Sequence, residues 1–259
     1  MTTFAICHLT LIPLRKEPDE LSEMVSQLLF GETVEILGTK GSWSHVRTHF
    51  DNYKGWVTSK MLTQISEEDL NAYQAAQKVY LNEPVCKVSV ADANLPVTYM
   101  AGGSTLLEKD NRLILGDHTL GIDHAATLHR NGDKVDIIGT ALKFLNTPYL
   151  WGGRTVFGID CSGFTQLVFK MNGMVLPRDA YQQADLGTLV HSVEDAQPGD
   201  LAFFELSKGK IIHTGIILPN REIIHSSGNV HIDRVDNQGI FNVQKQEHTH
   251  KLNRIKRFL

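Results

Sequence analysis

The sequence predicts an α+β protein in which short strands come first and a domain of helices followed by strands comes last. Through most of the first 130 residues, short apolar runs alternate with polar residues and end at glycine or asparagine turns. This pattern is typical of small β-barrels. From Asp133 the apolar spacing becomes helical, and after Leu176 it returns to strands. Helices followed by antiparallel strands indicate an α+β domain.

The composition is that of an ordinary globular protein without a charge bias toward nucleic acid. The chain has 259 residues, of which 42% are hydrophobic and 21% charged, and its formal net charge is -4. That length allows one large domain or two or three small ones. The basic stretch Asn253 to Arg257 is short and is expected to be solvated, so we predict no nucleic-acid partner.

The cysteines and the apolar runs indicate a reducing compartment and no membrane partner. The chain has three cysteines, Cys7, Cys86 and Cys161, and they are far apart. Their number and spacing indicate neither a disulfide framework nor a Cys-x-x-Cys zinc site. No run approaches the roughly 18 apolar residues of a transmembrane helix. The first residues alternate like a strand and lack the basic region of a signal peptide. We therefore expect a cytoplasmic monomer.

Residues 1–65 are predicted to form a small barrel. Phe4 to Leu14 has strand-like alternation, whereas the apolar residues from Leu21 to Phe30 keep helical spacing and predict a short helix or a compact loop. Three short strands follow between residues 32 and 62, and the last carries Tyr53-Lys-Gly-Trp-Val. This ending resembles bacterial SH3-like (SH3b) domains, which often accompany cell-wall hydrolases.

Residues 66–130 are predicted to hold a linker helix and a second, degenerate barrel. Ser66 to Gln77 opens with Ser-Glu-Glu-Asp, which places acids in the first turn of a helix. Val79 to about His129 is strand-like again but lacks the Gly-Trp-Val ending. Residues 131–259 then form the last domain.

The last domain is predicted to begin with two helices. Apolar residues between Val135 and Leu145 have helical spacing, and this helix ends at Asn146. The second helix begins near Cys161 and stops at Asn172-Gly173. Strands make up the remainder of the domain.

Cys161 is a candidate nucleophile because of its place in the second helix. It follows a glycine-punctuated loop and Asp160, a residue that favours the N-cap position. The positive end of a helix favours a thiolate, which is the reactive form of cysteine. The alternative is that Cys161 is a small buried hydrophobic residue, as most lone cysteines are.

Two histidines are candidates for the base that such a nucleophile needs. A tight turn about Asn220 would set His213 opposite residues 225 to 227, so that His213 and His225 share one face of a hairpin. We expect that face to be the one that the Cys161 helix covers. Each histidine alone is more often a satisfied strand residue, but together with the capped cysteine they favour a Cys-His-His arrangement.

The sequence lacks the motifs of other hydrolases. It contains no His-Glu-x-x-His, no Gly-x-Ser-x-Gly and no phosphate-cradling Gly-x-x-x-x-Gly-Lys. His248 and His250 have no acidic or histidine companion at metal-ligand spacing. We therefore expect no metal and no cofactor.

Five motifs, taken in order, resemble the NlpC/P60 cysteine peptidases of bacterial peptidoglycan. The resemblance covers about residues 130 to 259. The motifs are Pro-Tyr-Leu-Trp-Gly-Gly, Gly-Ile-Asp-Cys-Ser-Gly-Phe, Gln-Pro-Gly-Asp-Leu-Ala-Phe-Phe, His-Thr-Gly-Ile and Ile-Ile-His-Ser-Ser-Gly. The resemblance implies a papain-like NlpC/P60 catalytic domain preceded by one or two SH3b-like barrels. It also implies Cys161 as nucleophile, His213 as base, His225 as the third member and Tyr149 as a donor to the oxyanion.

The whole chain resembles the subgroup that joins SH3b domains to this core and removes L-Ala-γ-D-Glu from murein peptides of the form L-Ala-γ-D-Glu-diamino acid. In that subgroup an acid, a tyrosine and an aspartate hold the free amine, and the matching residues here are Glu23, Tyr53 and Asp179. Two carboxylates and a phenol oxygen satisfy the three donors of an ammonium group. Ala180 stands where relatives usually carry serine or threonine. The other expected substrate-binding residues are Trp151, Asp160, Ser162 and Arg178.

Two further functions stay open beside this dipeptidyl-peptidase. One is a hydrolase of intact cell wall in which the SH3b domains act as wall anchors. The other is a non-catalytic protein that binds murein peptides, which the complete reactive set disfavours.

Overall fold

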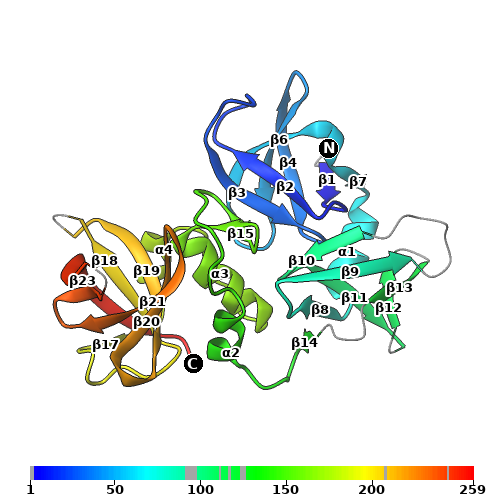
Figure 1. Cartoon of the computed structure of the whole chain (residues 1–259). Helices are drawn as coiled ribbons and strands as arrows, with labels where there is room; N and C mark the ends of the chain where they lie inside the picture. The colour runs from blue at the N-terminus through cyan, green and yellow to red at the C-terminus, as the bar shows by residue number, and fades with distance from the viewer. Residues whose placement is uncertain are drawn as a thin grey trace. The chain divides into compact units, whose positions relative to one another are not determined.

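The chain forms two compact units in the computed structural model, which describes residues 3–90, 98–110, 112–115, 118–122, 127–206, 209–243 and 245–259. The amino-terminal unit comprises Met1–Val135 and Lys170–Val175, and the carboxy-terminal unit comprises Asp136–Phe169 and Leu176–Leu259 (Figure 1). Mixed helices and antiparallel sheets confirm the α+β class.

The first sheet of the amino-terminal unit is a small barrel with its own core. Its seven strands pair in the order β3-β2-β6-β5-β4-β1-β7. The side chains that share its interior are completely buried: Ala5, Cys7, Ile12, Leu14, Leu28, Val34, Val46 and Val57. The strands are β1 (Thr3–Ile6), β2 (Leu11–Arg15), β3 (Met24–Leu29), β4 (Thr33–Lys40), β5 (Trp43–Thr48), β6 (Lys54–Thr58) and β7 (Thr63–Ile65), with the 3-10 turn η1 (Ser59–Met61) before β7.

The helix or compact loop predicted between Leu21 and Phe30 is wrong, because Met24–Leu29 is strand β3, paired antiparallel with β2. The last four residues of β3 are all buried. A strand buried on both faces loses its polar-apolar alternation, and the remaining apolar spacing then fits a helix equally well.

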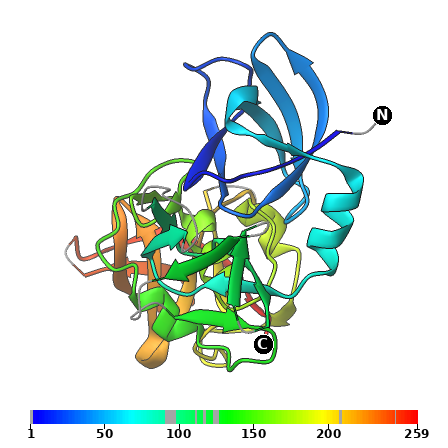
Figure 2. The ribbon, with the colours of Figure 1, turned by 90° about the vertical axis from the view of Figure 1, so that its right-hand side faces the viewer.

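A capped helix joins the first sheet to a second one. Helix α1 (Glu67–Ala75) begins with a capping box, in which Asp69 N donates to Ser66 Oγ at 3.0 Å and Ser66 N donates to Asp69 Oδ2 at 3.2 Å. This confirms the helix predicted from Ser-Glu-Glu-Asp. Figure 2 shows α1 in cyan between the blue strands of the first sheet and the green strands of the second.

The second sheet repeats the strand order of the first. Its order is β10-β9-β13-β12-β11-β8-β14, which is the order of the first sheet with seven added to each strand number. The sequence signal was degenerate, but the topology is the same. The strands are β8 (Lys78–Leu81), β9 (Val85–Val90), β10 (Thr98–Ala101), β11 (Thr105–Lys109), β12 (Arg112–Leu115), β13 (His118–Ile122) and β14 (Leu128–Arg130).

The carboxy-terminal unit places short helices before a closed sheet. The helices are α2 (Ile137–Leu142), α3 (Cys161–Met171), whose last turn extends beyond the unit's boundary at Phe169, and α4 (Ala180–Ala184). Helix α2 is shorter than predicted: it ends at Leu142, and a run of turns leads to Asn146, whose backbone is left-handed with φ of 66°. A small hairpin of β15 (Arg154–Thr155) and β16 (Gly158–Ile159) leads into α3.

The large sheet of this unit has the order β17-β23-β18-β19-β20-β21-β22, and an extra pairing of β22 with β23 closes β18 to β23 into a ring. Its interior holds Phe204, Ile217, Ile223, Val235 and Ile255, among others. The strands are β17 (Thr188–Val190), β18 (Leu201–Glu205), β19 (Ile211–Leu218), β20 (Glu222–Ser227), β21 (Asn229–Asp236), β22 (Gly239–Asn242) and β23 (Glu247–Arg257), with the 3-10 turn η2 (Pro219–Arg221) between β19 and β20.

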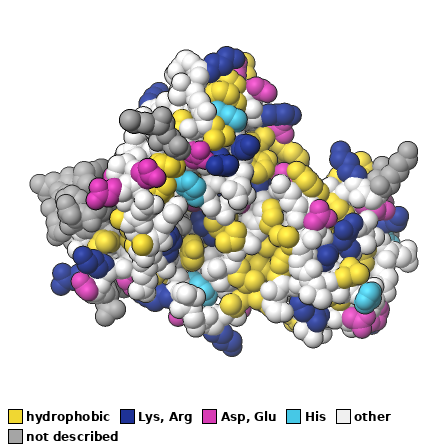
Figure 3. Space-filling model, turned by 180° about the vertical axis from the view of Figure 1, so that it is seen from behind, with side chains coloured by type: hydrophobic (Ala, Val, Ile, Leu, Met, Phe, Trp, Pro, Cys, Tyr) yellow, Lys and Arg dark blue, Asp and Glu magenta, His cyan; other side chains and the backbone are white. Residues whose placement is uncertain are grey.

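Charges of both signs are mixed on the described surface. Figure 3 shows Lys, Arg, Asp and Glu side chains interspersed over the face it presents. Among the described residues, no helix combines the length and the apolar character needed to cross a bilayer.

Gly55 in β6 leaves no room for a side chain, and this predicts a measurable loss of stability on substitution. A Cβ there would lie 2.7 Å from Leu14 Cγ and 2.9 Å from Arg15 O. Overpacking of this kind costs about 1–3 kcal/mol, so we expect Gly55→Ala to lower the melting temperature in thermal unfolding. Gly38 in β4 is the matched control, because a Cβ there meets no described atom within 4 Å. Equal melting temperatures for the two variants would contradict this packing.

Candidate active site

Asp160 anchors the start of the helix that carries Cys161. Its Oδ1 accepts a hydrogen bond from Gly163 N at 2.7 Å, which is the N-cap interaction predicted from the sequence. Its Oδ2 accepts from Gly152 N at 2.8 Å, and Arg178 donates to both oxygens at 3.0 and 2.5 Å. Asp160 and Arg178 are almost fully buried. The pair therefore fixes the loop before α3, the first turn of α3 and the segment before α4.

These contacts indicate a structural role for Asp160 and Arg178, two of the predicted substrate-binding residues. The Asp160 carboxylate already accepts five hydrogen bonds from the chain and, being ion-paired with Arg178, has no proton to donate to a substrate carboxylate. Arg178 is 1% exposed and also donates to Ser162 Oγ at 3.0 Å. We therefore assign Asp160 and Arg178 to holding the site together rather than to contacting substrate.

The thiol of Cys161 is buried, and burial opposes the helix-stabilised thiolate that the sequence predicts. Burial raises the pKa of Cys161 to about 12, and the negative charge of Asp160 acts in the same direction. The Thr214 backbone N–H and the Arg178 charge lower this pKa, but by less. The sequence pattern shows the helix end but not the burial of the sulfur, which is the larger influence on this pKa.

Cys161 lies against the open edge of strand β19. The ladder between β19 and β20 ends at the pair Gly215 and His225. Just beyond that pair, the Cys161 sulfur is 3.9 Å from the carbonyl oxygen of Ile212, and the N–H of Thr214 donates to it. The thiol therefore contacts the backbone on both sides of His213.

His213 and His225 share one face of the sheet, as predicted. His213 Nε2 and His225 Nδ1 are 2.9 Å apart, and both rings are buried. The pairing of Gly215 with His225 places residue 213 opposite residue 227, within the predicted range. Because Nε2 of His213 faces His225, Nδ1 is the ring nitrogen that we expect to accept the thiol proton.

The face that carries these histidines is the interior of the closed sheet, and the expectation that the Cys161 helix covers it is wrong. Phe204 and Ile223 lie on that face with the histidines. The neighbours of α3 contact the other face, where Ser226 Oγ donates to Ile159 O at 2.8 Å and Phe169 packs on Phe258. The prediction did not foresee that β22 and β23 close the sheet.

Asp233 is a member of this site that the sequence reasoning missed. His225 Nε2 is 3.4 Å from Asp233 Oδ2, and the carboxylate is 6% exposed. A carboxylate accepts from Nε2–H of His225, whose Nδ1 then accepts from Nε2–H of His213. This order leaves Nδ1 of His213 unprotonated and able to take the thiol proton. The only signal in the sequence was the spacing of His231 and Asp233, which are two residues apart in a strand-like stretch. Side chains at that spacing lie on one face of a strand.

Two more histidines surround the pair. The ring of His250 stacks on His213 with centroids 4.3 Å apart, and the ring of His231 is 4.5 Å from that of His225. Burial lowers the pKa of His213 well below its usual value, and its histidine neighbours act in the same direction. Burial lowers the pKa of His250 to about 4. The resting site is therefore an uncharged thiol beside an uncharged imidazole.

Tyr149 is placed near the thiol with its phenol protonated. Its N–H donates to Gly228 O at 2.9 Å, and it forms a bridge with Ile159 just before α3. Burial raises its pKa, and the Cys161 and Asp160 charges raise it further. A neutral phenol is a donor, which is what an oxyanion requires.

The remaining predicted residues fall into both units. Trp151 is 60% exposed, and Asp179 is half-buried at the start of α4, where its N–H donates to Gln182 Oε1 at 3.2 Å. Glu23 and Tyr53 belong to the amino-terminal unit. Glu23 is exposed, with Lys16 Nζ 3.3 Å from its Oε2, and Tyr53 packs against the barrel core.

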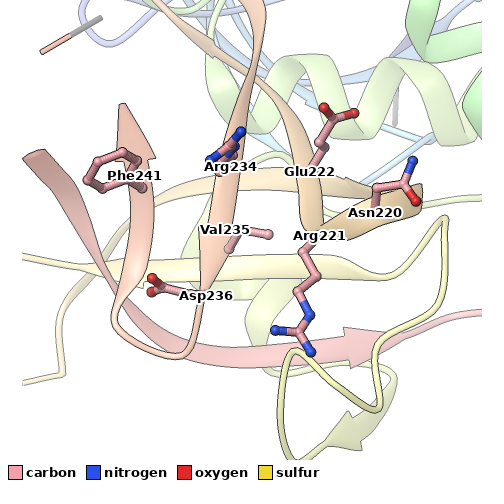
Figure 4. A pocket seen from close by; sticks show the side chains of 7 residues that line it. All are labelled: Asn220, Arg221, Glu222, Arg234, Val235, Asp236 and Phe241. Atoms are coloured by element: carbon pink, nitrogen blue, oxygen red, sulfur yellow. The ribbon is translucent and has the colours of Figure 1, made fainter. Parts of the chain in front are cut away.

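A separate pocket of about 490 Å³ lies where β20 begins and β21 ends (Figure 4). It is lined by charged side chains of both signs and contains none of the predicted site residues. It offers no nucleophile, so we do not assign the reaction to it. Its lining residues are Asn220, Arg221, Glu222, Arg234, Val235, Asp236 and Phe241.

Comparisons with known proteins match both parts of the chain. Residues 146–249 match the NlpC/P60 family, and residues 14–62 match the bacterial dipeptidyl-peptidase SH3 domain. The chain is 32% identical to a γ-D-glutamyl-L-lysine dipeptidyl-peptidase of Bacillus subtilis over 218 residues, which is 78% of this chain and 71% of the relative. It is 26% identical to dipeptidyl-peptidase 6 of Lysinibacillus sphaericus over 253 residues, covering 86% and 88%.

A solved structure has the same fold along the whole chain. It is an NlpC/P60 family protein from Bacillus cereus, with a TM-score of 0.82, 22% identity and coverage of 99% of each chain.

The buried Asp160–Arg178 pair predicts a large loss of stability when one partner is neutralised. Asp160→Asn leaves the Arg178 charge buried without its counter-ion, which costs about 3–5 kcal/mol. Chemical denaturation of the wild type and the variant measures this loss. The double variant Asp160→Asn/Arg178→Gln is the control, and we expect it to be more stable than the sum of the single losses implies. Simple additivity would show that the two side chains are not coupled.

Proposed function

Because this chain belongs to the NlpC/P60 family of cysteine peptidases, we propose that it hydrolyses the amide between the γ-carboxyl of D-glutamate and a diamino acid in murein peptides, releasing L-Ala-γ-D-Glu. The observation that carries this proposal is the contact of Cys161 with the backbone around His213, together with the hydrogen bond from His213 to His225. The names of the relatives supply the substrate class, since they are dipeptidyl-peptidases that act on γ-D-glutamyl-L-lysine.

The proposed reaction begins with proton transfer within the uncharged pair. His213 Nδ1 takes the thiol proton as Cys161 Sγ attacks the γ-carbonyl carbon of D-glutamate. The oxyanion accepts hydrogen bonds from the Cys161 N–H and the Tyr149 phenol. His213 then returns the proton to the leaving amine, and water hydrolyses the thioester that remains.

The order of protons along the two histidines supports this role for His213. His225 keeps Nε2 of His213 protonated, and Asp233 keeps Nε2 of His225 protonated. Both imidazoles are buried and held by neighbouring strands, so the base has one tautomer and one orientation. This is the task of the third member in triads of other folds.

We further propose that the enzyme selects peptides with a free amino-terminal L-alanine. The relatives are dipeptidyl-peptidases, and enzymes that count residues from an amino terminus must bind its ammonium group. Glu23, Tyr53 and Asp179 are the proposed ligands of that ammonium, from their match to the subgroup. Such selectivity suits the recycling of released murein peptides, whose L-alanine amine is free.

Mass spectrometry of a murein tripeptide after incubation tests the proposed reaction. We expect L-Ala-γ-D-Glu and a free diamino acid as the two products. Cys161→Ala should abolish turnover, since it removes the attacking sulfur. Cys86→Ala is the control, because it removes another buried thiol, from the second sheet, and should retain activity. Turnover by the Cys161→Ala variant would contradict the proposed mechanism.

A matched substrate pair tests the amine selectivity. We expect acetylation of the L-alanine amine to lower kcat/KM by at least about 100-fold, because it removes the charge that pairs with the proposed carboxylate ligands and the hydrogen bonds that the ammonium donates. Glu23→Gln should lower kcat/KM on the free peptide about tenfold and leave the slow rate on the acetylated peptide unaltered. Glu20→Gln, which changes an exposed carboxylate three residues away, should match the wild type. Equal rates on both peptides would instead favour an enzyme of the intact wall.

A further inference from the structure

Three side chains, one of them the catalytic His225, converge on one point. His225, His231 and Asp233 each direct one ligand atom toward it, and these atoms lie within 4.8 Å of one another. His225 in β20 pairs directly with His231 in β21, and Asp233 follows two residues later on the same face. His225 and Asp233 are buried, whereas the His231 side chain is 27% exposed. The convergence point is therefore held rigidly by two strands and borders solvent at His231.

His231 directs its Nε2 toward the Asp233 carboxylate. His231 Nδ1 is 2.9 Å from the carbonyl oxygen of Asn229. A carbonyl only accepts, so Nδ1 carries the proton and donates. His231 Nε2 lies 3.2 Å from Asp233 Oδ2. A cation at this nitrogen, whether a proton or a metal ion, therefore meets the carboxylate directly.

Two of the three spacings between the ligand atoms fit a tetrahedral zinc site, and the third, between the two imidazole nitrogens, is at most 4.8 Å. With metal–ligand distances of about 2.0–2.1 Å, the ligands of a tetrahedral ion lie about 3.3 Å apart. Asp233 Oδ2 is 3.4 Å from His225 Nε2 and 3.2 Å from His231 Nε2. Two imidazoles and a carboxylate with a fourth position open are a common zinc set.

Groups behind Asp233 hold its carboxylate in place. Asn242 Nδ2 donates to Oδ2 at 3.1 Å, and Val243 N donates to Oδ1 at 3.5 Å. Such outer contacts orient metal ligands in established sites.

We propose that His225, His231 and Asp233 form a binding site for Zn²⁺ and that the bound ion inhibits the peptidase. The binding half of this inference stands on the geometry alone, and the inhibitory half rests on the proposed function. The ion acts as a regulator of His213 and takes no part in the reaction.

The inhibition follows from the proton order of the histidine pair. A zinc ion takes the lone pair of His225 Nε2, so the proton of that ring moves to Nδ1 and is donated to His213 Nε2. The proton of His213 then sits on Nδ1, where the thiol proton must go. The number of protons on the two rings does not change, but His213 loses its function as a base. The ion therefore stops the reaction without touching Cys161.

Titration calorimetry of the metal-stripped full chain tests the binding half. We expect ZnCl₂ to bind with one high-affinity site per chain, and MgCl₂ to show none, because magnesium prefers oxygen ligands. His231→Gln should weaken zinc binding at least tenfold. His248→Gln is the matched control, since it removes a histidine paired with Asp236 outside this cluster, and Cys161→Ala shows that the catalytic thiol is not the ligand. Unchanged affinity in His231→Gln, or lost affinity in either control, would overturn the site.

Peptidase assays of the same proteins test the inhibitory half. We expect zinc to inhibit the wild type at the concentration at which calorimetry detects binding, and EDTA to restore the rate. His231→Gln, compared with its own metal-free rate, should need at least tenfold more zinc for the same inhibition. Full activity of the zinc-loaded wild type would overturn the inhibition. A metal-free wild type that cleaves no murein peptide would instead refute the proposed function, while the calorimetric result would still decide the site.

Discussion

The carboxylate of Asp160 holds three parts of the carboxy-terminal unit together at the point where the nucleophile begins. It caps the first turn of α3, accepts from the loop at Gly152 and pairs with Arg178 before α4. Because each contact is buried, moving any one of these segments would leave a polar group without its partner. Cys161 therefore has a fixed position relative to Tyr149 and to the edge of β19. A nucleophile held in this way reacts faster than one on a mobile loop, because less entropy is lost in reaching the geometry of attack.

Burial sets the resting charge of the site, and the same carboxylate acts in the same direction. Burial raises the pKa of the Cys161 thiol, and the negative charge of Asp160 beside it raises this pKa further. Burial keeps His213 neutral as well. An uncharged pair costs less to bury than a thiolate and an imidazolium. Charge then develops only when the substrate carbonyl is attacked, and the donors at Tyr149 and the start of α3 are placed to stabilise it at that moment.

Much of this fold was predictable because local patterns and tertiary structure agree. The capping box of α1, the Asp160 cap and the turn about Asn220 each depend on a few neighbouring residues, and the structure has them all. Strand β3 was missed because burial on both faces removed its alternation. The side of the sheet that carries His213 was missed because the closing pair of β22 and β23 joins residues brought together only in the fold. Asp233 was missed for the same reason, since nothing in one strand shows which histidine its carboxylate will meet.

Asp233 gives the histidine pair its direction. An isolated pair of neutral imidazoles has two equivalent proton orders, and only one of them leaves His213 able to act as a base. The carboxylate selects that order by accepting from His225. A carboxylate that is strong enough to do this also attracts any other cation that can reach it, and His231 leaves this side of the cluster partly open to solvent. The residue that makes the base effective is therefore the residue through which the base can be switched off.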